Sequence, residues 1–464
     1  MFHQLPNDCL KEIFEFLVKD KATLCSCLLV NRLWCLAVVP FLWTSIHNFR
    51  TFFTCLPQES KEILYENQII VSPPTQRCLI FNYVQYIKTF SNAEICKGIA
   101  FLLNNNSNNS QDNDICKNII AAQEIFKMLV KQISLKRLFY YTYTSNFLYI
   151  PFVNYPGAID CFKNLSELNC GSEINSELLY RLSQICQNLR TLNVTFDEFI
   201  STGLVDLISV QQRLNCLQIF QTYKCESFTS IIPSFKSLSQ SLTKFELYGG
   251  NHHNPPLSFI TQFTNLRELN LLFNHSDYSV DFRDAIFPNL RILIFKYFSP
   301  RFMYLNDFLK INGKYLRELQ IGRSNNLINL AISNFCLNLK YLRTNFLYNE
   351  EKTLKQIFNN CNQLTTLQIS CDNFYLNEIE LLEIVAENSP KGFHELKVCA
   401  CLIGTKLFSK SSRRTIFTED YIPKKILSIN LTIESNATDI DYTTINEFKK
   451  LGIIKKFKVI EDSY

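Results

Sequence analysis

The chain has 464 residues, of which 47% are hydrophobic, so it is long enough for several domains or for one extended repeat array. Its 47 basic and 42 acidic residues leave a formal net charge of +5, an excess too small to indicate a nucleic-acid binder. Glycine (11) and proline (14) are scarce, which argues against an all-β fold built on tight turns.

The 18 cysteines pose the question of a secreted, disulfide-linked framework. The opening residues MFHQLPND contain no basic region of the kind that begins a signal peptide, and no apolar stretch follows them. No segment approaches 18 uninterrupted apolar residues. We therefore expect no membrane association and a reducing compartment, cytoplasmic and/or nuclear, in which cysteine serves as a small core residue.

The first predicted part, residues 1–46, is a small bundle of short helices. Leu10, Phe14 and Leu17 recur at three- and four-residue spacing, which is typical of one helix face. A second helical region follows, and Pro40 is expected to end it.

The second predicted part, residues 47–133, is a mostly helical linker. The expected helices span about 52–65, 83–103 and 115–132. The low-complexity run NNNSNNSQDND at 104–114 is predicted to be a flexible loop, with no function assigned.

The third predicted part, residues 134–464, is repetitive. The spelling Asn-Leu-x-x-Leu recurs, with its first leucine at Leu165, Leu189, Leu266, Leu290 and Leu339. Looser copies lie between and beyond these, and neighbouring copies are mostly 24 or 25 residues apart. A period of about 20–29 residues with the pattern L-x-x-L-x-L is typical of leucine-rich repeats.

Helix-like stretches between the short apolar runs predict a strand and a helix in each repeat. The expected fold class is therefore α/β: a helical bundle, a helical linker and a horseshoe solenoid with a parallel sheet. The most regular repeats are 165 to 369, and a last strand at about 453–460 is expected to cap the array.

The N-terminal segment resembles the F-box family from Leu5 to Ile46. The pattern LP…L…IF…L…V…W…P.LW is held in order over more than thirty residues, with Asp8 where glutamate is commoner. The resemblance implies that this segment docks a Skp-type adaptor protein, which joins it to cullin and RING subunits, while the repeats capture a target protein. The implied adaptor-binding residues are Leu5, Pro6, Leu10, Ile13, Phe14, Leu17, Val30, Trp34, Pro40, Leu42 and Trp43.

The apolar residues of this segment allow two interpretations. About forty residues with two tryptophans carry more apolar surface than so small a bundle can bury, which favours a partner surface. Alternatively, the same face packs on the helices that follow in the chain. Spacing alone does not separate these readings, and the family resemblance favours docking.

No catalytic or metal-binding constellation is found in the sequence. There is no phosphate-binding loop, no G-x-G-x-x-G and no G-x-S-x-G motif. His252-His253 lies between glycine and proline pairs, which is typical of a loop, and the Cys-x-Cys pairs lack zinc spacing. We therefore predict no enzyme activity, no metal and no cofactor. Basic clusters such as Arg413-Arg414 are interpreted as a solvated surface; the alternative is a weak binding site for an acidic partner.

The positions between the repeat leucines are predicted to face outward on the concave side of the sheet. Aromatic residues and arginine are the usual anchors of interfaces. The candidate target-binding residues are Phe220, Tyr248, Glu268, Glu318, Tyr341 and Arg343. The predicted function is that of the substrate-recognition subunit of a Skp–cullin–F-box ubiquitin ligase; the alternative is a leucine-rich-repeat scaffold acting outside any ligase.

Overall fold

The computed structural model of the chain describes most of the sequence. The described residues are 5–46, 49–69, 80–104, 111–141, 150–225, 227–249, 257–273, 284–296, 302–347, 349–370, 378–400, 406–407, 429–435, 439–440, 442–450, 452 and 454–460. His252-His253, Arg413-Arg414 and most of the predicted 104–114 loop lie outside them. The chain forms two compact units, one of residues 1–218 and 233–238, the other of 219–232 and 239–464.

The first unit begins with helices and continues into alternating strands and helices. Its elements are α1 (Asn7–Phe16), α2 (Lys21–Cys27), α3 (Arg32–Leu42), α4 (Phe49–Thr54), α5 (Gln58–Glu66), η1 (Tyr83–Tyr86), β1 (Thr89–Ser91), α6 (Asn92–Asn104), α7 (Gln111–Gln132), β2 (Arg137–Tyr140), η2 (Phe152–Asn154), α8 (Ala158–Phe162), β3 (Glu167–Gly171), α9 (Ser176–Ile185), β4 (Thr191–Phe196) and α10 (Thr202–Ser209). The boundary between the units falls within β5 (Cys216–Gln221) and η3 (Thr229–Leu238).

The second unit continues the alternation. Its elements are β6 (Lys244–Gly249), η4 (Leu257–Gln262), β7 (Glu268–Leu272), β8 (Ile292–Lys296), α11 (Phe302–Asn312), η5 (Gly313–Tyr315), β9 (Glu318–Ile321), α12 (Asn326–Phe335), β10 (Tyr341–Arg343), α13 (Glu351–Asn360), β11 (Thr366–Ser370), α14 (Glu378–Asn388), β12 (Glu395–Ala400), β13 (Lys406–Leu407), β14 (Ile429–Ser435), β15 (Asp439–Ile440), α15 (Tyr442–Lys450) and β16 (Ile454–Ile460).

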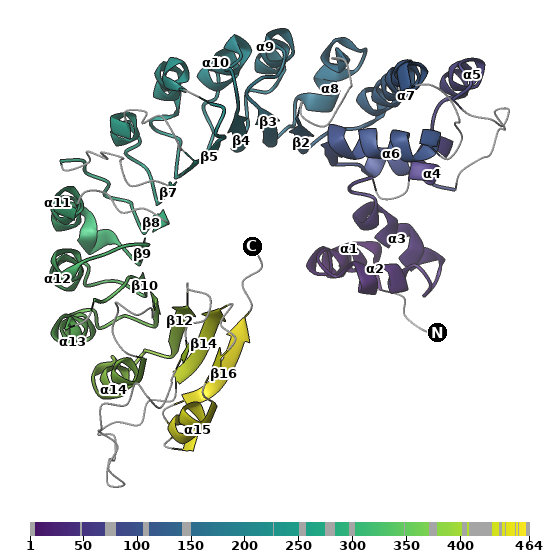
Figure 1. Cartoon of the computed structure of the whole chain (residues 1–464). Helices are drawn as coiled ribbons and strands as arrows, with labels where there is room; N and C mark the ends of the chain where they lie inside the picture. Colours follow the sequence, from purple (N-terminus) through teal and green to yellow (C-terminus); the bar gives the residue numbers. More distant parts are fainter. Residues whose placement is uncertain are drawn as a thin grey trace. The chain divides into compact units, whose positions relative to one another are not determined.

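Parallel pairing of successive strands confirms the predicted fold class. In the first unit β1, β2, β3 and β4 pair in that order, and in the second unit β6 to β12 do so, followed by β14 and β16. Helices α11 to α14 lie on one side of β9 to β12 (Figure 1). The opposite side of β6 to β12 carries the alternate residues of each strand, and we call it the open face.

The repeat leucines form the core between strands and helices. Leu189 and Leu192 of the first unit are fully buried, as are Leu290 and Leu293 of the second. The register of the strands aligns these leucines in a column, because Leu168 pairs with Leu192 and Leu269 pairs with Leu293 across neighbouring strands. Each leucine therefore packs on the equivalent leucine of the next repeat, as the 24-residue spacing predicts.

The linker differs from its prediction in three places. The expected helix 83–103 is interrupted by β1, which pairs with β2, so the parallel sheet begins at Thr89 rather than after residue 133. The expected helix 52–65 is two helices, because Pro57 stands at the N-cap of α5. In the predicted 104–114 loop, the described residues Asn104 and 111–114 are helical, since α6 ends at Asn104 and α7 begins at Gln111.

The end of the bundle also differs from its prediction. Pro40 does not end a helix but lies in the last turn of α3, which continues to Leu42. A proline removes one backbone donor, and so close to the helix end little of the helix depends on that hydrogen bond.

Candidate functional site: an apolar helical bundle and the open face of the sheet

Helices α1, α2 and α3 lie together as a bundle (Figure 1), and this bundle has a core of its own. The ring of Phe14 meets that of Trp34 edge-on at 5.6 Å between centroids. Leu10, Phe14 and Leu24 are fully buried together. Side-chain caps define the helix starts, since Asp20 accepts from the Thr23 N–H at 3.0 Å and Asn31 accepts from the Trp34 N–H at 2.9 Å.

This core corrects part of the predicted adaptor surface. Leu10 and Phe14 have no exposed area, so a docked partner cannot contact them. Their spacing on one face of α1 reflects packing against α3 within the bundle. Leu17, Trp34 and Leu42 are partly buried against the same core. Pro40 is also half-buried.

Several large apolar side chains of the bundle are exposed. Among the predicted docking residues, Leu5, Pro6, Ile13 and Val30 are exposed. The sequence interpretation missed Phe16, which is 91% exposed, and Leu29, which is 88% exposed. Val18 and Leu36 are exposed as well. Phe16 follows Ile13 by three residues, which places both on one side of α1, and this spacing was the available signal.

Trp43 joins the bundle to the linker. Its ring lies 4.3 Å from that of Tyr83, centroid to centroid. The neighbouring carbonyl oxygen of Thr44 accepts from the N–H groups of Lys88 (2.9 Å) and Thr89 (3.0 Å). Trp43 was predicted to bind the adaptor, but its observed contact is within the chain, and the bundle end is tied directly to β1.

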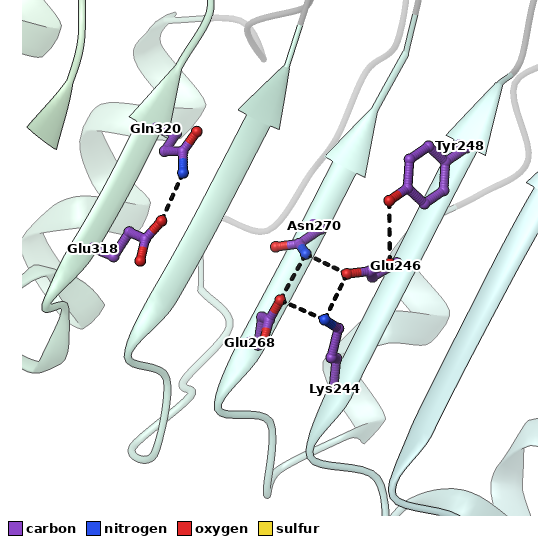
Figure 2. Close-up of polar contacts among 7 residues, drawn as sticks. All are labelled: Lys244, Glu246, Tyr248, Glu268, Asn270, Glu318 and Gln320. Atoms are coloured by element: carbon purple, nitrogen blue, oxygen red, sulfur yellow. Dashed lines mark hydrogen bonds and ion pairs between the residues drawn. The ribbon is translucent and has the colours of Figure 1, made fainter. Parts of the chain in front are cut away.

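The open face of β6 and β7 carries a ladder of polar contacts (Figure 2). The ammonium group of Lys244 lies 2.8 Å from Glu246 Oε1 and 2.9 Å from Glu268 Oε1. The amide nitrogen of Asn270 donates to the same two oxygens, at 2.6 and 2.8 Å. The Tyr248 hydroxyl donates to Glu246 Oε2 at 3.2 Å.

Burial and charge set the protonation of this ladder. Partial burial lowers the pKa of Lys244, but the hydrogen bonds and charges of Glu246 and Glu268 outweigh that effect and raise the pKa above its ordinary value. Burial and the neighbouring Glu246 carboxylate also raise the pKa of Tyr248. Lys244 is therefore cationic and Tyr248 neutral at physiological pH.

The six predicted target-binding residues lie on the outward positions of the sheet. Register brings Glu268, Glu318 and Tyr341 into one row, with Ile292 of β8 between the two glutamates. Tyr341 donates to the Gln368 side chain, and Arg343 lies one row further along β10. The remaining two, Phe220 and Tyr248, contact each other.

The ring contact joins Phe220 of β5 to Tyr248 of β6, the first strand of the open face. The centroids of Phe220 and Tyr248 are 6.0 Å apart. Phe220 is more than half exposed, whereas Tyr248 is partly buried beside Glu246. The pair offers an apolar surface next to the charged ladder.

A short motif recurs on the outward positions and was missed in the sequence. Glu-Leu-Asn at 167–169 and 268–270 and Glu-Leu-Gln at 318–320 each place an amide two residues after a carboxylate. In each, the amide nitrogen donates to that carboxylate, at 3.0, 2.8 and 2.6 Å respectively. Its repetition at the strand positions was the signal that could have revealed it.

Comparison with known proteins agrees with the geometry of the bundle. The family model described as F-box-like matches residues 2–48. The chain carries an F-box-like domain. That domain contains α1, α2 and α3 and the exposed apolar residues described above. No curated protein sequence matches the chain.

Two solved structures are similar to the chain. One is the leucine-rich repeat-containing protein LegL7 from Legionella pneumophila, at 12% identity over 71% of this chain and 84% of that chain, with a TM-score of 0.30. The other is the Toll–Spatzle complex from Drosophila, at 12% identity over 73% of this chain and 48% of that chain, with a TM-score of 0.36. The assignment of leucine-rich repeats beside the F-box-like domain rests on the strand register and the buried leucines.

Two other kinds of site are absent from the described part of the chain. In these ranges no helix is both long and apolar enough to cross a membrane. Within the same residues, no three His, Cys, Asp or Glu side chains gather as a metal ion would require.

Proposed function

We propose that this protein is the substrate-recognition subunit of a Skp–cullin–F-box ubiquitin ligase. The F-box-like domain docks a Skp-type adaptor, through which cullin and RING subunits are recruited, and the open face of the repeats holds the target protein. The observation that carries the proposal is the set of exposed apolar side chains on the bundle, above all Phe16 and Leu29. So many exposed apolar groups on a domain of this size are typical of a partner surface.

In this proposal the chain has no active site of its own. Its contribution is proximity, because a tethered target presents its lysines to the ubiquitin-transfer subunits at a high effective concentration. It requires no cofactor, and it acts in the cytoplasm, the nucleus or both, where such ligases work.

The test is a binding titration of the full chain with purified Skp-type adaptor. We expect the double variant Leu5→Ala, Pro6→Ala to bind about ten- to a hundredfold more weakly, since a few anchors dominate interface energy. Both residues are exposed, so the bundle should stay folded. Ile159→Ala, at an exposed position in α8 outside the bundle, is the control and should bind as wild type.

Tryptophan fluorescence separates loss of contact from loss of fold. Trp34 packs on Phe14 in the core and Trp43 on Tyr83, and the chain has two tryptophans in all. An unchanged spectrum with unchanged adaptor binding would remove Leu5 and Pro6 from the surface. Absence of adaptor binding by the wild-type chain would favour the alternative, a leucine-rich-repeat scaffold acting outside a ligase.

A further inference from the structure

The open face contains an apolar strip between two polar strands. Ile292 and Ile294 of β8 lie on the open face and are partly exposed. Register places Ile292 between Glu268 of β7 and Glu318 of β9. Because β7 and β9 are both neighbours of β8, their backbones are about 10 Å apart. The two glutamates therefore lie on either side of an apolar surface one strand wide, which is the floor of the site.

Both side-chain amides beside the strip already donate to carboxylates. Asn270 gives its amide hydrogens to Glu246 and Glu268. Gln320 likewise donates to Glu318 at 2.6 Å. Figure 2 shows both amide–carboxylate pairs, one on each side of β8. Carboxylate and amide oxygens are left over, and a ligand that fits them must bring donors.

One of these acceptors is buried and has no partner. The Asn270 side chain is 95% buried, being 5% exposed, and its Oδ1 makes no hydrogen bond. Figure 2 shows this oxygen turned away from Glu246. The oxygen and nitrogen of this amide cannot be exchanged, because the oxygen would then face the carboxylate oxygens of Glu246 and Glu268. A buried acceptor without a donor is unfavourable, so this atom gains from any donor that reaches it.

The charges of the surrounding face favour a cation. Three carboxylates, Glu246, Glu268 and Glu318, surround this region, and Lys244 already contacts the first two. Lys296 also belongs to β8, but it lies four residues beyond Ile292, about 13 Å along the strand. The row of Ile292 is therefore negative.

We propose that this part of the open face binds an arginine side chain of the target protein, a statement that deepens the proposed function and rests on it. The aliphatic stem of the arginine covers Ile292 and Ile294. Its guanidinium lies between Glu268 and Glu318 and donates to both, and Asn270 Oδ1, which neighbouring side chains cover, accepts a further hydrogen bond once they shift. Arginine fits better than lysine, because its planar group carries five donors on more than one edge and can serve acceptors on both sides at once.

The test observes the floor of the site directly by NMR of isoleucine methyl groups in the full chain. N-acetyl-arginine amide is titrated in, with the neutral isostere N-acetyl-citrulline amide as the comparison. We expect saturable shifts of the Ile292 and Ile294 methyls with the arginine compound and a roughly tenfold or greater loss of affinity with citrulline. Methyl signals are assigned from Ile292→Val and Ile294→Val.

A pair of glutamate variants tests the charge. Glu318→Gln should weaken the arginine compound by about tenfold, because a charge-assisted bond becomes a neutral one. Glu395→Gln changes another partly exposed glutamate of the same face, three strands away on β12, and should leave binding unchanged. Equal shifts with citrulline, equal binding by Glu318→Gln, or no shift at either isoleucine would overturn the proposal.

Adaptor binding of the same variants keeps the two proposals apart. Glu318→Gln should bind the Skp-type adaptor as wild type. If the arginine site fails while the adaptor still binds, the ligase function stands without this target chemistry. If the adaptor fails to bind while the methyl shifts persist, the arginine site stands as a property of a free scaffold.

Discussion

Buried cysteines occupy an equivalent position in several repeats. Cys186, Cys336 and Cys361 each stand three residues before the first repeat leucine, and each is fully buried or nearly so. The thiol of Cys186 lies 3.4 Å from the carbonyl oxygen of Phe162, and that of Cys361 lies 3.4 Å from the carbonyl oxygen of Cys336. The burial of these thiols agrees with the prediction that cysteine serves as a small core residue. Their contacts with the backbone of the preceding repeat are seen only in the structure.

Thiol reactivity should follow this burial. Burial raises the pKa of the Cys186 and Cys361 thiols to about 12, from an ordinary value of 9.0. We expect iodoacetamide at pH 8 to modify the exposed Cys9 and Cys25 in the native chain but neither of the buried thiols, as read by peptide mass spectrometry. Addition of urea should make all four reactive, and rapid native labelling of Cys186 would contradict its placement.

The same pKa shift predicts how stability depends on pH. Above pH 9 the thiol ionises in the unfolded chain but stays protonated in the folded one until about pH 12. The unfolded state is thereby favoured, so the stability contributed by Cys186 is complete below pH 9 and is lost between pH 9 and 12. The free energy of unfolding should fall less steeply with pH in Cys186→Ala than in wild type.

At the scale of the element, the position of these cysteines is taken in other repeats by a buried amide. Gln211, three residues before Leu214, donates from Nε2 to the carbonyl oxygen of Cys186 at 2.7 Å and accepts from the Leu189 N–H at 3.1 Å. In the repeat of Leu316 the amide stands one residue earlier, at Asn312, whose Nδ2 donates to the carbonyl oxygen of Ala285 at 2.8 Å. Each amide links its helix end to the backbone of the preceding repeat.

Removal of one such link should weaken the array. Gln211→Ala leaves two buried backbone groups unpaired, which is expected to lower the free energy of unfolding by about 1–3 kcal/mol, measured by urea titration. Gln212→Ala is the matched control, because Gln212 is exposed, and it should change stability by less than about 0.5 kcal/mol. Equal effects of the two changes would show that the amide link contributes nothing.

Long periodic elements could be predicted from the sequence, and short ones could not. The 24-residue spacing identified the strands that begin near Thr191 and Glu268, and apolar periodicity identified α7. β1 has three residues, too few for any periodicity, and it is defined by pairing with β2. Its place in the sheet is a tertiary property, so the boundary between linker and repeats was misplaced.

The elements that carry the candidate site were predicted for the same reason. Period and family pattern located the bundle and the outward side of the strands, because both depend on spacing. Spacing did not separate Phe14, which is buried, from Phe16, which is exposed, since that depends on how α1 meets α3. The hydrogen bonds of Asn270 were likewise hidden, because they depend on the register between β6 and β7.

At the scale of the whole molecule, the F-box-like domain of residues 2–48 stands in a defined relation to the strands that follow it in the first unit. Within the first unit this relation depends on a small joint. Trp43 packs on Tyr83, and Thr44 receives two backbone hydrogen bonds from the start of β1. The bundle is therefore continuous with the first strand of the sheet, and deletion of residues 1–46 would remove a partner of β1 as well as the F-box-like bundle.

Tyr83→Ala should loosen this joint without unfolding either side. The variant lacks the ring contact with Trp43, so local opening of the joint costs less free energy. We therefore expect faster amide hydrogen exchange at Lys88 and Thr89, whose N–H groups donate to Thr44. Exchange in β3 and β4 should stay as in wild type, since their hydrogen bonds lie within the repeats.

Tyr65→Ala provides the comparison for this experiment, because Tyr65 is an exposed aromatic residue of the neighbouring helix α5. It should leave exchange at Lys88 and Thr89 unchanged. Faster exchange throughout the first unit in Tyr83→Ala would mean that Tyr83 supports global folding rather than the joint. Wild-type protection at Lys88 and Thr89 in that variant would mean that the ring contact does not hold the bundle to β1.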